Sequence, residues 1–295
     1  MMLVGSITPV SVYAQSLSER ASTATSVQQA SSSNDATPID SQVLNDWKLI
    51  WSDEFDGPNG APVDQAKWGF ETGGTGWNQN ELEYYTDQTS NAQIQDGNLL
   101  LVARKEAYQG NQYTSARLIS KGKFEQMYGR FEARMKIPTG QGLWPAFWLL
   151  GNDIDSVSWP QCGEIDIMEH INSEAQIGAH LHGPGYYSKM AFGQDVTLPG
   201  NEDFGAQYHL YAVEWEPDAV RFYVDDLLYF TVSVNDMPSG RKWVYDHPFY
   251  ILLNLAVGGN WPGAPDATTV FPATLSVDYV RVYIHNNWTY TRHRT

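Results

Sequence analysis

Basic residues, cysteines and long apolar runs are scarce in this chain of 295 residues. Lys and Arg number 18 against 34 Asp and Glu, which gives a formal net charge of −16. This charge repels polyanions and argues against nucleic acid and sulfated polymers as partners, whereas a neutral polymer is indifferent to it. No stretch approaches 18 apolar residues, so no membrane span is expected. The single cysteine, Cys162, excludes an intramolecular disulfide and a cysteine-based metal site.

Aromatic residues, by contrast, are plentiful, with 11 Trp and 17 Tyr. Such residues are favoured in the cores of β-sheets. Their flat faces also stack on the C–H faces of pyranose rings. Composition alone favours the first explanation and leaves the second open.

The chain divides by composition into four parts. Residues 1–14 are mildly apolar and end in Val12-Tyr-Ala14, which is similar to a signal-peptidase site, but they lack a basic start. We expect either a signal peptide, and hence a secreted protein, or a tail. Residues 15–45 are rich in Ser, Thr and Gln and should form a disordered leader. Residues 46–286 form one domain, expected to be monomeric, and 287–295 form a C-terminal tail.

Within this domain the pattern is one of short alternating runs without helical periodicity. Period two with β-branched and aromatic residues predicts strands, at residues 98–103, 129–136, 211–216, 220–224, 249–254 and 276–283. Many such strands and no convincing amphipathic helix predict an all-β protein, a two-sheet antiparallel β-sandwich. Two long loops, at 57–80 and 184–206, are expected to rim its binding face.

The most informative segment is Gly163-Glu-Ile-Asp-Ile-Met-Glu-His170. In a regular strand Glu164 and Asp166 share one face, and Glu169 lies on the other. A β-bulge around Ile167 and Met168 would bring Glu169 onto the first face. Three carboxylates on one face repel each other and raise at least one pKa, as glycoside hydrolysis requires. The alternative, a solvated acidic strand, fits poorly with the Ile, Met and Trp around it.

At this point the sequence resembles glycoside hydrolase family 16, and within it the laminarinase-like endo-β-1,3-glucanases. The resemblance covers residues 47–284. Its motifs follow one another in the family's order: Trp51-Ser-Asp-Glu-Phe-Asp56, Gly76-Trp-Asn-Gln-Asn-Glu-Leu-Glu-Tyr-Tyr85, Gly129-Arg-Phe-Glu-Ala-Arg134, Leu143-Trp-Pro-Ala-Phe-Trp148, the carboxylate segment, Leu181-His-Gly-Pro-Gly185, Gly258-Gly-Asn-Trp-Pro262 and Val277-Asp-Tyr-Val-Arg-Val282.

The resemblance implies a concanavalin-like jelly roll with a concave substrate groove and a retaining double displacement that requires no cofactor. Glu164 matches the nucleophile, Glu169 the general acid/base, and Asp166 the carboxylate that tunes both. His182 matches the family histidine near the catalytic centre. The five-residue step from Glu164 to Glu169 resembles the bulged subgroup of the family.

Sugar-binding residues are predicted around these acids. Trp144 and Trp148 share a strand face, and the resemblance places them and Trp159 at sugar subsites, with Trp261 as a further platform. Phe147, on the opposite face, is the better core residue. The family uses an asparagine in the loop containing Asn78 and Asn80, and Asn80 is our choice. Arg134, on a strand expected to neighbour the acids, could orient a carboxylate or a sugar, or could lie on the surface.

Two kinds of metal site were considered. His180 and His182 share a strand face, but with no suitable third ligand they make a poor zinc site. The family often binds a structural Ca²⁺ far from the groove, and the matching oxygen donors are Glu54, the carbonyl of Gly97, and Asp278.

The sequence therefore predicts an endo-acting retaining hydrolase of β-1,3 links in a neutral, laminarin-like β-glucan. Three alternatives stay open. These are the same chemistry on another β-linked polymer (mixed-linkage glucan, β-galactan or agarose), transglycosylation, and a non-catalytic β-glucan-binding protein. The last is disfavoured because both glutamates are present.

Overall fold

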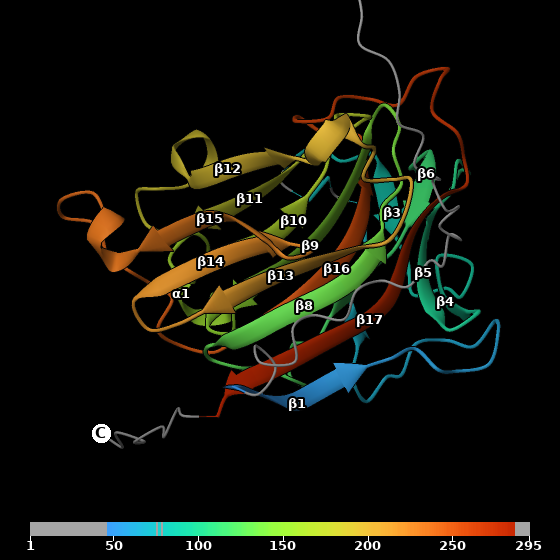
Figure 1. Cartoon of the computed structure of the whole chain (residues 1–295). Coiled ribbons are helices and arrows are strands. Elements are labelled where there is room, and N and C mark those ends of the chain that lie inside the picture. The colour runs from blue at the N-terminus through green and yellow to red at the C-terminus, as the bar shows by residue number, and fades with distance from the viewer. Residues whose placement is uncertain (1–45, 75, 78, 287–295) are drawn as a thin grey trace, which may run out of the picture. The chain divides into compact units, whose positions relative to one another are not determined.

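The computed structural model describes residues 46–286 except 75 and 78, and their regular secondary structure is almost entirely β-strand (Figure 1). The predicted signal peptide (1–14), leader (15–45) and C-terminal tail (287–295) lie outside the described residues. So does Asn78.

The strands form two antiparallel sheets that pack face to face (Figure 1). The eight-stranded sheet runs in the order β15 (Leu227–Ser233), β14 (Ala219–Val224), β13 (His209–Trp215), β8 (Gly129–Lys136), β17 (Ala273–His285), β5 (Asn98–Ala103) and β4 (Ala92–Gln95), with β1 (Trp47–Asp53) also paired to β17. The seven-stranded sheet runs β12 (Phe192–Thr197), β11 (Gln176–His182), β10 (Glu164–Glu169), β9 (Leu143–Gly151), β16 (Phe249–Val257), β7 (Arg117–Ile119) and β2 (Gly69–Phe70).

Smaller elements complete the described part of the chain. β3 (Glu83–Tyr85) and β6 (Tyr113–Ser115) form a parallel pair. The helical elements that lie wholly within the described residues are α1 (Ile154–Val157) and short 3-10 segments at Ser188–Met190, Pro199–Asn201 and Val234–Asp236. The sandwich and all six predicted strands are thus confirmed. The expected loop at 184–206 is corrected, because it contains β12. This edge strand was missed because its side chains are mostly exposed and show little apolar alternation.

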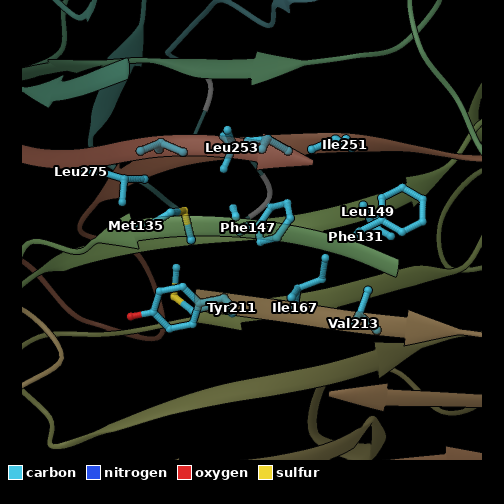
Figure 2. Close-up of a cluster of buried hydrophobic side chains, with 14 of the residues drawn as sticks. Phe131, Met135, Phe147, Leu149, Ile167, Tyr211, Val213, Ile251, Leu253 and Leu275 are labelled. Atoms are coloured by element: carbon cyan, nitrogen blue, oxygen red, sulfur yellow. The ribbon is translucent and has the colours of Figure 1, made fainter. Parts of the chain in front are cut away.

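The core lies between the two sheets and follows from the alternation of side chains along each strand. In β8, Phe131 and Met135 point into this core, whereas the charged residues between them point outward. β9 of the other sheet contributes Phe147 and Leu149 from the opposite side (Figure 2). The prediction that Phe147 is a core residue is therefore confirmed.

The seven-stranded sheet also has an outer face, which we call the carboxylate face. Trp144 and Trp148 of β9 lie on it, and Trp148 packs there against Leu150 and Tyr250 in a second, smaller apolar cluster. The two neighbouring strands β9 and β16 are thus apolar on both faces, and their packing on both sides holds the centre of the sheet in place.

The predicted β-bulge is present in β10. Asp166 lies opposite Trp148 of β9, but the next paired residue of β10 is Met168, opposite Phe147, so Ile167 is the extra residue. Ile167 and Met168 are both fully buried in the core between the sheets. Because two successive residues point inward, Glu169 returns to the face that carries Glu164 and Asp166.

The bulge predicts an unusual pattern of destabilisation. Ile167→Ala and Met168→Ala should each lower the free energy of unfolding by about 2–5 kcal/mol, because each leaves a cavity in the same core. In a regular strand one of these neighbours would face outward, and its truncation would cost little. Leu49→Ala in β1, where the leucine is 47% exposed, is the control and should stay within about 0.5 kcal/mol. Urea unfolding measures all three, and a small effect for either Ile167 or Met168 would contradict the bulge.

Candidate active site

Three acidic side chains and two histidines meet on the carboxylate face. Glu164 and Asp166 of β10 lie opposite His182 and His180 of β11 in the antiparallel register. Glu169 joins them across the bulge. Ligand-type atoms of Glu164, Asp166 and His182 lie within 4.8 Å of one another, and so do those of Asp166, Glu169 and His180. Asp166 is therefore central to the row, with one glutamate on either side.

Glu164 is held by a tryptophan and faces a histidine. The indole N–H of Trp159 donates to its Oε2 at 2.7 Å. Nε2 of His182 lies 3.9 Å from Oε1 of Glu164 and 3.1 Å from Oδ2 of Asp166. Because Nδ1 of His182 accepts the backbone N–H of Ser188 at 3.1 Å, a neutral His182 carries its proton on Nε2, toward the two carboxyls.

Asp166 is only 2% exposed and lies between two other acids. Burial raises its pKa well above the usual range, and the negative charges of Glu164 and Glu169 raise it further. Asp166 is thus the carboxyl of the row that keeps a proton most readily. A neutral Asp166 removes one of the three like charges from the row.

Glu169 has a partner for each carboxylate oxygen. Trp144 donates its indole N–H to Oε1 at 3.1 Å, and Nδ1 of His180 lies 2.8 Å from Oε2. Burial raises the pKa of Glu169, but the hydrogen bond from His180 and the charges of His180 and His182 outweigh burial and leave it lowered. Burial likewise lowers the pKa of His180, and the contact with Glu169 outweighs burial and raises it.

This arrangement suits a reaction that needs a nucleophile and a proton donor on one surface. Glu164 and Glu169 sit on either side of Asp166, whose pKa is raised whereas that of Glu169 is lowered, and such separation of pKa values assigns acid and base roles to neighbouring acids. The two sets of closely spaced ligand-type atoms would also suit a metal in number. However, Nδ1 of His182 accepts the Ser188 N–H, so a neutral His182 carries its proton on Nε2, the nitrogen that faces the carboxyls, and offers no lone pair to a metal there. We therefore assign the cluster to acid–base chemistry.

Two tryptophans are exposed at opposite ends of the carboxylate row. Trp159, 40% exposed, lies next to Glu164, and its ring centroid is 5.9 Å from that of His182. Trp261, 45% exposed, makes edge contacts with Trp144 at 5.3 Å and with His180 at 6.0 Å. Both have a free ring surface on which a sugar can stack.

Trp148 has a different position from the one expected for a sugar platform. It is only 9% exposed, its indole N–H donates to Asn254 at 2.8 Å, and the guanidinium of Arg117 lies 4.8 Å from its ring centroid. It lies on the predicted face, but it forms the floor beneath the acids more than a free stacking surface.

Asn80 reaches the site through a neighbouring loop. Its side-chain amide donates to Asn260 at 2.9 Å, and the backbone N–H of Asn260 donates to the carbonyl of Gln79 at 2.7 Å. These bonds join the loop around Asn80 to the segment that carries Trp261. Asn80 is thus placed beside Trp261, where the amide can reach a bound sugar or fix the tryptophan.

The structure does not bring Arg134 to the site. β8 belongs to the eight-stranded sheet, and Arg134 points outward from it, where it pairs with Asp278 at 2.7 Å and stacks on Tyr208. The expectation that β8 neighbours the acids is wrong, because β10 pairs with β9 and β11. Sequence reasoning also missed His180 as a partner of Glu169. Its shared strand face with His182 is the available signal, but that face alone does not show that His180 reaches Glu169.

The predicted calcium donors do not fit an ion in their present arrangement. Both oxygens of Glu54 accept hydrogen bonds from Arg281, at 3.0 and 2.8 Å, and Asp278 is paired with Arg134. Each carboxylate is thus neutralised by a guanidinium that a calcium ion would have to displace. Gly97 lies in the tight turn between β4 and β5 and has a positive φ of 73°.

Among the described residues, no helix has the length and apolarity that crossing a bilayer demands.

Comparisons with known proteins agree with the chemistry of the site. Residues 75–281 match the family model for glycosyl hydrolases family 16. The chain is 42% identical over 251 residues to a beta-glucanase of Rhodothermus marinus, and the match covers 80% of this chain and 85% of that protein. It is 36% identical over 271 residues to glucan endo-1,3-beta-glucosidase A1 of Niallia circulans, covering 84% of this chain and 39% of that protein.

Among solved structures, the chain is similar to the laminarinase catalytic domain of Thermotoga maritima. The TM-score is 0.78 and the sequence identity is 45%, with coverage of 82% of this chain and 100% of that one.

The raised pKa of Asp166 predicts a pH-dependent effect on stability. A carboxyl whose pKa is raised by folding contributes stability below its unfolded pKa, and this contribution is lost as the pH rises through the folded pKa. Asp166→Asn keeps the shape of the protonated acid but cannot ionise. Relative to the wild type, the variant should gain stability as the pH rises from 4 to 9. Thermal unfolding across this range measures the effect.

The control for this experiment is Asp226→Asn, which removes an exposed carboxyl in the turn between β14 and β15. Its melting temperature should follow the wild type at every pH. A difference between Asp166→Asn and wild type that does not change with pH would contradict the raised pKa of Asp166.

Proposed function

Since the chain belongs to glycosyl hydrolases family 16, we propose that it is an endo-acting β-1,3-glucanase that cleaves laminarin-like glucans with retention of configuration. The observation that carries this proposal is the bulge in β10, which places Glu164, Asp166 and Glu169 on one face between two exposed tryptophans. The names of the Niallia and Thermotoga relatives support the choice of β-1,3-glucan.

The residues divide the reaction into two displacements. In the first, the Glu164 carboxylate attacks the anomeric carbon, and Glu169 gives its proton to the leaving oxygen. In the second, Glu169 takes a proton from water, and the water oxygen displaces Glu164 from the same carbon. Trp159, through its N–H bond to Glu164, fixes the direction of the nucleophile. Asp166 lies beside Glu164, and its raised pKa favours the neutral form, which limits charge repulsion in the row.

The open face explains attack within a long polymer. The carboxylates lie on an outer sheet surface, with stacking surfaces next to Glu164 on one side and Glu169 on the other. A chain of sugars can lie across both tryptophans with its scissile bond over Asp166. A neutral glucan also avoids repulsion by the net charge of −16.

We extend the proposal to where and in what form the enzyme acts. An enzyme that cleaves a long polysaccharide encounters its substrate outside the cell. Together with the signal-like segment at 1–14, this supports secretion. The three carboxylates, both histidines and both exposed tryptophans come from one chain, which supports a monomer. The chemistry uses side chains alone, so we propose that turnover needs no cofactor.

Replacement of Glu164 tests the nucleophile directly. Glu164→Gln should abolish release of reducing ends from laminarin, because the amide cannot attack the anomeric carbon, while its oxygen can still accept the Trp159 N–H. Glu169→Gln should lower kcat by about 10²–10⁴-fold. Melting temperatures check that both variants fold. Full activity of Glu164→Gln would overturn the assignment.

The substrate and stereochemistry are tested on the same preparation. Laminarin, a mixed-linkage glucan, a β-galactan and agarose are compared by reducing-end release, and laminarin should be cleaved best. Proton NMR of the earliest product should show the β anomer. An α anomer would contradict retention, and binding of laminarin without cleavage would indicate a recognition protein.

The two exposed tryptophans should separate in their kinetic effects. Trp261→Ala should raise KM roughly tenfold, a loss of about 1.4 kcal/mol of binding, with a smaller change in kcat, whereas Trp261→Phe keeps a stacking ring and most of the affinity. Trp159→Phe should lower kcat, because it removes the N–H donor to Glu164 but keeps an aromatic face. Steady-state kinetics on laminarin measure both. Unchanged KM in Trp261→Ala would remove this residue from the sugar-binding surface.

A further inference from the structure

His180 contacts the acid/base carboxylate directly, yet the two displacements described above do not use it. Its Nδ1 lies 2.8 Å from Oε2 of Glu169. The indole N–H of Trp144 occupies the other oxygen at 3.1 Å. With one partner on each oxygen, the Glu169 carboxylate cannot rotate without breaking a hydrogen bond, and His180 is one of the two groups that orient it.

The strands around His180 leave space for an imidazole. Gly193 of β12 is its cross-strand partner, and a Cβ there would lie 2.5 Å from Cδ2 of the ring. Gly178, two residues earlier on β11, would bring a Cβ within 2.9 Å of Cε1. Neither glycine has the positive φ that favours glycine. Both glycines therefore serve to admit the ring, and glycine within a strand often marks such a close approach.

The charged groups that face His180 come from three strands. Glu169 and Asp166 of β10 favour its protonated form, whereas His182 on its own strand opposes it. Asp195 of β12 borders the same space, since its Oδ1 would lie 3.0 Å from a Cβ at Gly178. Acidic neighbours thus outnumber basic ones around a largely buried imidazole.

We propose that His180 is the positioning residue of the acid/base: it orients Glu169 and shares with it the single proton that cleavage consumes and hydrolysis returns. The inference rests on the proposed function and deepens it by assigning the acid/base role to a pair of side chains. It also explains a conflict within the site, because the contact with His180 lowers the pKa of Glu169, which is unfavourable for a group that must donate a proton.

The proton balance of the pair closes over one turnover. Before cleavage the pair holds one proton, either on His180 beside a Glu169 carboxylate or on Glu169 beside a neutral imidazole. As Glu164 bonds to the anomeric carbon, the bond to the leaving oxygen breaks, its electrons stay on that oxygen, and the proton of the pair binds it. The pair then holds none. Attack by water breaks the bond to Glu164, and the proton released from water returns to the pair.

Sharing of the proton between Glu169 and His180 changes which ionisation limits activity at high pH. When two groups are coupled this closely, the loss of their proton belongs to the pair. The raised pKa of His180 keeps the proton in the pair beyond the pH at which a lone carboxyl would release it. The alkaline limb of the pH profile of kcat/KM should therefore depend on the residue at position 180.

The matched variants are His180→Asn and His180→Ala. An asparagine amide can take the place of Nδ1 and donate to Glu169, but it does not titrate, whereas alanine removes both functions. In His180→Asn the alkaline limb should move to lower pH, which costs roughly tenfold in kcat/KM per unit of displacement. His180→Ala should show the same displacement and a lower rate throughout.

Two outcomes would overturn the proposal. A wild-type pH profile in His180→Asn would mean that His180 only orients the carboxylate, and a wild-type profile in His180→Ala would mean that it does neither. The space that Gly178 and Gly193 leave for the imidazole gives a second test. Gly193→Ala should displace the ring and reproduce the displaced alkaline limb, and adding it to His180→Ala should cause no further loss in kcat/KM. If the losses of the two single variants add in the double variant, Gly193 does not act through the position of the His180 ring.

A measurement without substrate separates this inference from the proposed function. In the wild type the imidazole of His180, followed by NMR, should titrate above the ordinary value of 6.5, and Glu169→Gln should lower that pKa. If the enzyme cleaves no glucan, the proposed function fails. This titration then decides by itself whether His180 and Glu169 share a proton. A His180 pKa that does not respond to Glu169→Gln would overturn the shared proton.

Discussion

The extra residue in β10 is the constraint on which the active site depends. A strand alternates its side chains, so a five-residue step would otherwise place Glu164 and Glu169 on opposite faces. The core enforces the exception, because Ile167 and Met168 are successive residues and both are fully buried. Turning Glu169 away from the carboxylate face would require moving one of these side chains out of the core, at a cost of a few kcal/mol. Apolar packing thus holds three mutually repelling acids together.

The same site separates its protons by giving each acid different neighbours. Asp166 lies between the other two carboxylates, and burial together with their charges raises its pKa. Glu164, the proposed nucleophile, receives an indole N–H from Trp159. Glu169 faces an imidazole, so its proton is held by a pair. These differences come from strand pairing, since β11 places His182 opposite Glu164 and His180 opposite Asp166. Register, more than residue identity, decides which acid does which task.

The sequence was sufficient to predict features that depend on local alternation. The six strands and the assignment of Phe147 to the core follow from which neighbours are apolar, whereas the bulge follows from the requirement that Glu169 share a face with Glu164 and Asp166. Arg134 shows where this reasoning ends, because alternation predicts that it points out of its strand but not which sheet that strand joins. β12 was missed because an exposed edge strand has little apolar pattern. The contact between His180 and Glu169 depends on both the bulge and the β10–β11 register. The number of residues between His180 and Glu169 in the sequence does not reveal how these two features combine.

The two tryptophan N–H donors connect substrate binding to the chemistry. Trp159 and Trp144 each donate to one glutamate, and Trp144 also supports the exposed ring of Trp261. An indole is suited to this position, because its face is apolar and its N–H can only donate. A sugar that stacks on Trp159 contacts a side chain that is hydrogen-bonded to Glu164. A sugar that stacks on Trp261 contacts a ring that packs against Trp144, the hydrogen-bond donor to Glu169. Binding energy from the neighbouring sugars can in this way help to orient the proposed nucleophile and proton donor. Contacts with non-reacting parts of the substrate then contribute to kcat as well as to affinity.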